Sequence, residues 1–403
     1  MNKKTNFFTI LLVLVCVCTS CIDEIDFETE TFESALVIEA TITDEFKNQE
    51  VLLSRTFKFE EDGPNPELNA NVRIESDNGT FTFQEMEDGK YVSTETFATQ
   101  ANINYQLLVT TSDGRSYSSA QTQSTSTTQI DDVYAERETN DDGVNGISIY
   151  ADSFDPSGNS RYYRYEYLET AKVIAPFWTP MDLNVTLPDF PDCEVEVVNR
   201  TQEEQLCFRT VSSININQVN TTTFTEDRVS RHLVRFISSD NFLLTQRYSI
   251  LVSQYIQSAA AFTYFETLKE FSGENGSLFS QSQPGFFSGN VFSVSNSVEK
   301  VIGFFDVSTV SSERIFFNYD DFYPGEEAPP FIVSCDPVAP SRVELGSCGS
   351  LISEVLRNRV KYLDTNDGVN YEQLDGGPYL VVLRECGDCT ALGDNVEPDF
   401  WQE

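Results

Sequence analysis

The sequence predicts a mainly β protein with more than one β-rich region, and three observations support this. Short apolar runs alternate with polar residues at the two-residue period of a half-buried strand. Turn residues of the Asx-Gly type separate several of these runs, as in β-hairpins. Hydrophobic residues make up 40% of the 403 positions, which is enough apolar material for real cores.

The first region, residues 35–117, has the densest strand pattern. The steps Asn78-Gly79, Asp88-Gly89 and Asp113-Gly114 supply the positive φ of tight turns. This spacing predicts an immunoglobulin-like or prealbumin-like β-sandwich. The expected strands are at 36–38, 51–53, 72–74, 81–83, 91–93 and 105–109.

Residues 118–129 (SSAQTQSTSTTQ) contain no charge and no large apolar side chain, so we expect a linker there. Residues 130–403 then form a second β-rich domain, with a core of the fibronectin type. Residues 176–193, rich in Pro and aromatic residues, predict an irregular insertion. The expected strands of this domain are at 147–150, 162–167, 208–216, 301–305, 314–317 and 379–383.

Residues 258–272 break the strand pattern and predict a helix. Ser258 is placed to cap its start and Gly273 to end it. The stripe of Phe262, Phe265 and Leu268 fits a core face better than a face that docks a partner. Residues 351–363 are a possible second helix.

The N-terminus has the pattern of an export signal over residues 1–20. Lys3 and Lys4 precede an apolar run that is too short to span a membrane. Small residues directly before Cys21 resemble a bacterial lipobox, so we predict that Cys21 is the lipid attachment site, carrying palmitate-type acyl chains. An ordinary signal cleaved near Ser20, with Cys21 unmodified, is the alternative.

Residues 21–34 are expected to form an acidic tether. The Ile-Asp-Glu-Ile-Asp stretch at 22–26 resembles the acidic export signals of Bacteroidetes lipoproteins that reach the cell surface. The expected location is therefore the outer membrane, with a lipid anchor and exposure at the cell surface.

Six cysteines remain when Cys16, Cys18 and Cys21 are set aside, and an exported chain favours disulfides between them. The simplest pairing is local, Cys193 with Cys207 and Cys335 with Cys348, and leaves the pair Cys386 and Cys389. The main alternative joins Cys386 or Cys389 to Cys335 or Cys348. A zinc or redox role for the Cys-Gly-Asp-Cys motif fits the spacing and context less well.

Charge and composition exclude several function classes. The net charge of −38 opposes nucleic-acid binding, which depends on Lys and Arg. The single histidine, His232, has no Gly-x-Ser-x-Gly motif to accompany it, so we predict no catalytic residue, no metal site, no cofactor and no enzymatic activity. A pair of acids for hydrolysis stays an alternative that the sequence cannot place.

Acidic loops raise a second alternative, calcium binding. Residues 140–143, 318–321 and 364–368 lack the spacing of the twelve-residue calcium loop, and we interpret them as hairpin turns. Aromatic clusters at 177–178, 286–287 and 322–323 are candidate contact loops, although most aromatic residues belong to cores.

Several segments together carry a family resemblance: 247–250, 276–279, 288–291, 301–308, 314–316, 386–389 and 395–401. They resemble the family that carries domain of unknown function 4249, and the resemblance covers nearly all of the mature chain. It implies an outer-membrane lipoprotein of Bacteroidetes, often encoded beside TonB-dependent receptors. It implies no catalytic residue.

The expected function is that of a non-catalytic binding or accessory partner of a TonB-dependent receptor, in ligand capture or uptake. The alternative is a structural or assembly subunit of an envelope protein complex. No nucleic-acid partner is expected.

Overall fold

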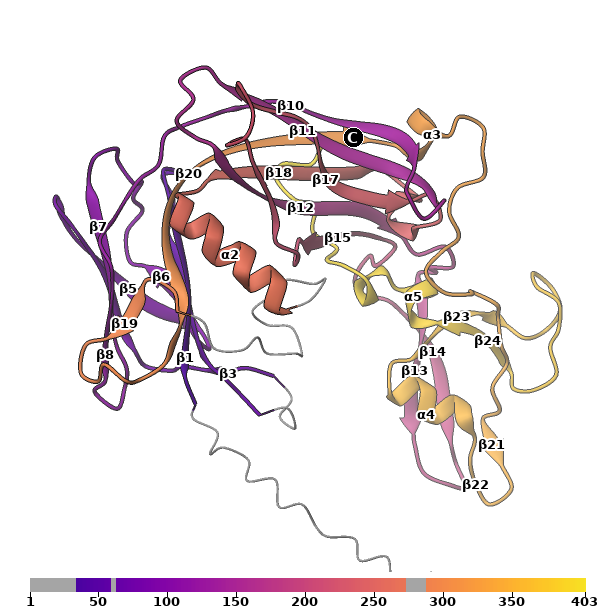
Figure 1. Cartoon of the computed structure of the whole chain (residues 1–403). Helices are drawn as coiled ribbons and strands as arrows, with labels where there is room; N and C mark the ends of the chain where they lie inside the picture. The colour runs from indigo at the N-terminus through magenta and orange to yellow at the C-terminus, as the bar shows by residue number, and fades with distance from the viewer. Residues whose placement is uncertain (1–33, 59–62, 273–287) are drawn as a thin grey trace, which may run out of the picture. The chain divides into compact units, whose positions relative to one another are not determined.

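The computed structural model describes residues 34–58, 63–272 and 288–403, and Ala35–Glu403 form one compact unit. The chain is mainly β, as the sequence predicts (Figure 1). Most strands belong to one large sheet, and smaller sheets complete the fold. The path through the large sheet is β15-β12-β18-β20-β1-β2-β6-β5-β4-β7-β8-β19.

The first third of the chain forms the part of the large sheet that runs from β1 to β8. Every strand expected between 36 and 109 is present, and the three Asx-Gly steps turn β4 into β5, β5 into β6 and β7 into β8. A cluster that includes Ile38, Ile74 and Leu107 forms its core. The sandwich itself stays a prediction. The strands are β1 (Leu36–Thr43), β2 (Glu50–Arg55), β3 (Asn65–Pro66), β4 (Asn71–Ser76), β5 (Gly79–Glu87), β6 (Lys90–Ser93), β7 (Asn104–Thr110), β8 (Ser116–Ser119) and β9 (Thr122–Gln123).

One 17-residue strand, β20 (Val301–Phe317), joins the two halves of the large sheet. Its first half pairs in parallel with β1, and its second half pairs antiparallel with β18. We predicted two separate strands here, at 301–305 and 314–317. That division is wrong, since β1 pairs with β20 as far as Ser308 and β18 pairs with it from Thr309 onward. Phe305 packs in the first core and Phe317 in the second.

Residues 118–129, expected as a linker, are hydrogen-bonded to the large sheet. They include the end of β8 and all of β9. The Thr125 hydroxyl donates to the Ile256 carbonyl at 2.9 Å and accepts from the Thr309 N–H at 3.0 Å. Ser and Thr hydroxyl groups can thus hydrogen-bond this segment to the backbone of neighbouring strands, although the segment has no apolar face to bury.

The middle of the chain supplies a three-stranded sheet, β10-β11-β17, and the end of the large sheet. An apolar cluster with Ile149, Tyr165 and Val252 contains side chains from both, so the two sheets pack face to face. The strand expected at 208–216 ends at Ser212. The elements are β10 (Ile130–Thr139), β11 (Asn145–Asp155), β12 (Tyr162–Ile174), β15 (Leu206–Ser212), β16 (Asn217–Asn220), β17 (Asp227–Ser238), η1 (Phe242–Leu244), β18 (Tyr248–Ile256) and β19 (Val291–Ser293).

The helix predicted at 258–272 is present as α2 (Ala259–Ser272). The Ser258 hydroxyl accepts a hydrogen bond from the Ala261 N–H at 3.1 Å, which is the expected N-cap. Leu268 and Tyr264 pack with Phe304 of β20, so this side of α2 is a core face.

The C-terminal part contains two corrections. Residues 176–193 are not irregular throughout, because β13 (Met181–Leu187) forms a hairpin with β14 (Glu194–Asn199). The helix expected at 351–363 ends early, since α4 (Ser350–Leu356) is followed by a turn with Asn358 at a φ of 53° and then by a strand. The other elements are α3 (Tyr319–Phe322), β21 (Val343–Glu344), β22 (Ser347–Cys348), β23 (Val360–Thr365), β24 (Tyr379–Leu383), α5 (Arg384–Gly387) and η3 (Cys389–Ala391).

All six cysteines that follow Cys21 are in disulfides, but the local pairing is wrong. The bridges are Cys193–Cys348, Cys207–Cys389 and Cys335–Cys386. The third bridge belongs to the crossed alternative, and the two cysteines of Cys-Gly-Asp-Cys enter different bridges. Spacing favoured short loops, whereas the fold brings β15 against the C-terminal residues and the β13–β14 hairpin against α4. The bridges therefore attach the C-terminal segment to this hairpin and to β15.

Candidate functional site

A cavity of about 290 Å³ lies where β1 and β2 meet β12, β18 and β20, beside α2. This volume is near the lower end of the range for small-molecule sites. The cavity is lined by polar and aromatic side chains, which include Glu39, Arg164, Tyr255, Phe265 and Phe304.

Strand β1 positions the polar side of the cavity. Successive side chains of a strand point to opposite faces. Leu36, Ile38 and Ile42 lie in the first core, so the intervening Glu39 and Thr41 point to the other face of the sheet. That face would be open to solvent in a simple sheet.

On β20, Phe304 and Asp306 share this face, because they are the register partners of Glu39 and Thr41. Helix α2 packs on the same side, with Tyr264 against the Phe304 ring at 5.2 Å between centroids. The helix thus encloses a face that carries two carboxyl groups.

Arg164 of β12 enters the cavity from the other half of the sheet and is held on three sides. Its guanidinium forms an ion pair with Glu166 on the same strand. Its Cζ lies 4.6 Å from the centre of the Tyr255 ring and 4.8 Å from that of Phe265, in cation–π geometry. Arg164 is only 9% exposed, so this charge is fixed and largely desolvated.

The ionisable groups of this cavity leave some polar atoms without a hydrogen bond. In the lining, these buried atoms are Oε1 of Glu39 and Nε of Arg164. Oδ1 of Asp306, which is on the same face of the sheet but outside the lining, is a third. Buried polar atoms in folded proteins are nearly always hydrogen-bonded, so such a group close to a cavity indicates a place for a ligand.

Burial raises the pKa of Glu39 to about 8, against a lowering effect from Arg164 and a smaller raising effect from Glu166. Burial also raises the pKa of Asp306, although the Ser308 hydroxyl and Arg164 oppose that shift. Glu39 therefore holds a proton at neutral pH. A perturbed carboxyl group in a cavity is a frequent property of functional sites.

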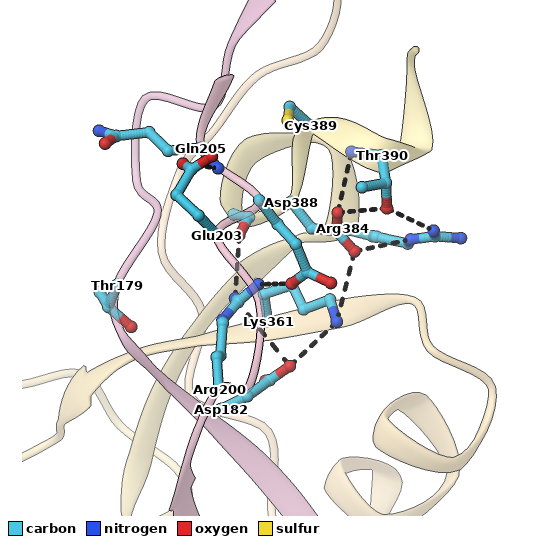
Figure 2. A network of polar contacts seen from close by, with 12 residues as sticks. Thr179, Asp182, Arg200, Glu203, Gln205, Lys361, Arg384, Asp388, Cys389 and Thr390 are labelled. Atoms are coloured by element: carbon cyan, nitrogen blue, oxygen red, sulfur yellow. Dashed lines mark hydrogen bonds and ion pairs between the residues drawn. The ribbon is translucent and has the colours of Figure 1, made fainter. Parts of the chain in front are cut away.

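A second polar cluster, in the C-terminal part, has a different character (Figure 2). Lys361 Nζ lies 2.9 Å from Asp182 Oδ2 and 3.4 Å from Asp388 Oδ2, and Arg384 Nε lies 3.2 Å from the same Asp388 oxygen. Asp388 Oδ1 accepts from the Thr390 N–H at 2.9 Å.

These contacts leave the charges of the second cluster satisfied. Burial alone would raise the pKa of Asp388, but the Thr390 hydrogen bonds and the Lys361 charge lower it overall. Arg200 reaches the same place and donates to the Gly387 carbonyl at 2.9 Å. We interpret this network as a structural link between the hairpin, β23 and the Cys-Gly-Asp-Cys segment (Figure 2).

The site residues expected from the sequence do not gather at the cavity. Cys21 and the residues 1–20 lie outside the described residues. The six other candidates, Cys193, Cys207, Cys335, Cys348, Cys386 and Cys389, form the three disulfides, away from the cavity lining.

His232 has a structural environment. Its Nε2 lies 2.8 Å from the Asn217 Oδ1, and its ring packs on Tyr165 at 4.7 Å between centroids. Burial and the charge of Lys269 lower its pKa to about 4, so the ring is neutral at pH 7.

The acidic loops are also explained by local structure. Residues 140–143 turn β10 into β11, with Gly143 at a φ of 81°. Residues 318–321 are not a hairpin turn, because Asn318 and Asp321 form the capping box of α3. Residues 364–368 begin with the last two residues of β23 and continue into the long loop that leads to β24. In the described ranges, no three His, Cys, Asp or Glu side chains are grouped as metal ligands.

The aromatic clusters contribute mainly to packing. Tyr323 is buried and stacks on Tyr319 with 4.6 Å between ring centres, while Phe177 and Trp178 pack near the disulfides. Phe286 and Phe287 lie outside the described residues.

Sequence reasoning missed Glu39 and Arg164. The available signal was one acid in an otherwise apolar and Thr-containing strand, Leu-Val-Ile-Glu-Ala-Thr-Ile-Thr. Alternation alone assigns that acid to a solvated face, and only the packing of α2 on this face makes it buried.

No helix in the described part of the chain is long and apolar enough to cross a membrane. The family model described as Domain of unknown function (DUF4249) matches residues 22–314. No curated protein matches the chain.

Among solved structures, the chain is similar to a protein of the DUF4785 family from Legionella pneumophila, with 11% identity and a TM-score of 0.17. That match covers 55% of this chain and 51% of the other, so the chain spans about half of that protein's length.

Proposed function

This chain belongs to the family of Domain of unknown function (DUF4249), and from that premise we propose that it is a non-catalytic binding protein of the outer-membrane surface. It captures a small ligand in the Glu39 cavity and works as an accessory partner of a TonB-dependent receptor in ligand uptake. Cys21 carries the lipid anchor in this proposal.

The observation that carries the binding function is the cavity between β1, β12 and α2. Its walls combine aromatic rings with ionisable groups, and buried atoms of Glu39 and Arg164 have no hydrogen-bond partner there. This combination of apolar surface and a few unsatisfied polar groups is typical of small-molecule sites. Binding is favoured over catalysis because the sequence offers no nucleophile and base arrangement.

The anchoring and the receptor partnership are supported by different observations. Small residues precede Cys21 after a short apolar run, and acidic residues follow it directly. The receptor partnership is supported by the family resemblance, which implies genes for TonB-dependent receptors as neighbours.

Co-purification from outer membranes tests this proposal. The native protein is isolated in mild detergent and its partners are identified by mass spectrometry, with Cys21→Ala as the unanchored control. We expect a TonB-dependent receptor in fixed proportion to the native protein and its loss with the variant. Partners drawn only from barrel-assembly or secretion components would instead support the structural or assembly role, and a protein that is isolated alone would contradict the partnership.

A further inference from the structure

Most of the charged side chains around the cavity form ion pairs, and one carboxyl group does not. Arg164 pairs with Glu166, Lys47 pairs with Glu45, and the lining residue Glu50 lies 3.0 Å from Lys90 Nζ. Glu39 is the cavity-lining carboxyl group for which the described residues show no ion pair and no hydrogen bond to Oε1.

The buried ionisable groups around Arg164 include more carboxyl groups than basic groups. Three carboxyl groups, those of Glu39, Glu166 and Asp306, act electrostatically on one guanidinium, that of Arg164. The guanidinium is already engaged by one carboxylate and two aromatic rings. A cationic ligand can take the place of the proton that Glu39 holds, whereas an anion meets no unpaired cation among the described lining residues.

The apolar part of the lining indicates the rest of the ligand. Phe304 and Phe265 stand beside Tyr264 on one wall, and Leu52, the register partner of Glu39 on β2, also contributes to the lining. A compact apolar or aromatic body fits such walls, and the volume of about 290 Å³ limits it to a small molecule.

We propose that the cavity binds a small organic ammonium ion, whose N–H groups donate to Glu39 while its apolar body lies against Phe265 and Phe304. This assignment rests on the proposed binding function and names its ligand class. When the ammonium ion enters, Glu39 gives up its proton to solvent, so one positive charge replaces another and the net charge of the site is unchanged.

The proton exchange makes binding depend on pH. Charged or titratable groups approach Glu39 from every element around it: Arg164 and Glu166 of β12, Tyr255 of β18, Tyr264 of α2, Asp306 of β20, Glu50 of β2 and Lys47. With the pKa of Glu39 at about 8, an amine that stays protonated binds about tenfold more tightly at pH 7 than at pH 6, and its affinity levels off above pH 8.

Calorimetry on the full, detergent-solubilised protein tests the ligand class with three probes of one shape. These are 2-phenylethylammonium, the neutral 2-phenylethanol and the anionic 3-phenylpropionate. We expect saturable binding of the ammonium ion, at least tenfold weaker binding of the other two, and release of close to one proton per bound ammonium ion at pH 7, measured in buffers of different ionisation enthalpy.

Two variants complete the test. Glu39→Gln keeps the size of the side chain and is expected to abolish both the preference for the ammonium ion and the proton release. Glu75→Gln makes the same chemical change at an exposed, ion-paired residue outside the cavity lining and should retain both.

Equal binding of the alcohol, tighter binding of the carboxylate, or an unchanged response of Glu39→Gln would each overturn the assignment. Because the calorimetric measurements use the isolated protein, their results do not depend on whether a receptor co-purifies. The wild-type probe comparison also decides the question if Glu39→Gln fails to fold.

Discussion

Replacing Glu39 by Gln removes a proton that the folded state holds, and this should change how stability depends on pH. In the folded protein, burial raises the pKa of Glu39 from 4.5 to about 8. The unfolded chain therefore binds fewer protons than the folded chain between these two pH values. Under that condition, the free energy of unfolding falls as pH rises.

The size of this effect follows from the shift. One pKa unit corresponds to about 1.4 kcal/mol, so the wild type should lose up to about 5 kcal/mol between pH 4.5 and pH 8 through Glu39. Glu39→Gln does not titrate and lacks this loss. The variant should therefore gain stability relative to the wild type as pH rises, and the difference should level off above pH 8.

Urea unfolding followed by circular dichroism at several pH values between 5 and 9 measures the difference. Comparing the two proteins at each pH cancels the general repulsion of a chain with a net charge of −38, and also the contribution of Asp306, which titrates in both. Glu75→Gln, at an exposed residue outside the cavity lining, serves as the control and should run parallel to the wild type. Parallel curves for Glu39→Gln and the wild type would refute the argument that Glu39 is protonated in the folded state.

Three further predictions concern the rest of the described structure. Lys361→Met leaves the buried Asp388 without one of its cations and should lower the free energy of unfolding in urea by about 3–5 kcal/mol. The control Arg73→Met breaks an exposed pair and should lower it by about 0–1 kcal/mol. Equal losses in the two variants would contradict the structural role of the buried network. Gly289→Ala places a Cβ 1.6 Å from the Gly303 carbonyl oxygen, so the backbone at position 289 must move away from β20. We expect a loss of at least about 1–3 kcal/mol, and unchanged thermal stability would be the contrary result. In the folded protein, the pKa of His232 is lowered from 6.5 to about 4, so its ring is neutral at pH 7. The free energy of unfolding of the wild type should therefore fall by up to about 3 kcal/mol as pH falls through this range. A His232→Asn variant that loses as much stability would contradict this pKa.

The strands of the first region were predictable because their determinants are local. Apolar alternation and an Asx-Gly step define a hairpin within about ten residues of sequence. Gly89, for example, has a φ of 75° between β5 and β6, as its position in the sequence indicates. The N-cap of α2 at Ser258 is equally local.

The failures concern features that depend on distant segments. Strand β20 continues through a polar run because β1 and β18 supply partners on either side of it. The disulfides follow the fold, and Cys207 meets Cys389 across 182 residues of sequence. Spacing along the chain carries no information about such pairs.

The cavity shows the same limitation most clearly. Glu39 belongs to a strand that was predicted, yet its chemical role depends on Arg164 and on α2, which approach it from the other half of the sheet. A charged residue that interrupts an apolar strand was the visible signal. Its burial was not predictable without the arrangement of the strands.

The most direct test of the central claim reads Glu39 itself. Carbon-13 NMR of Glu-labelled protein, with the Glu39 signal assigned by its absence in Glu39→Gln, follows the titration of this carboxyl group with and without saturating 2-phenylethylammonium. The account predicts a pKa of about 8 in the free protein and a clear decrease when the ammonium ion is bound. A pKa close to 4.5 that is unchanged by the ammonium ion would contradict it.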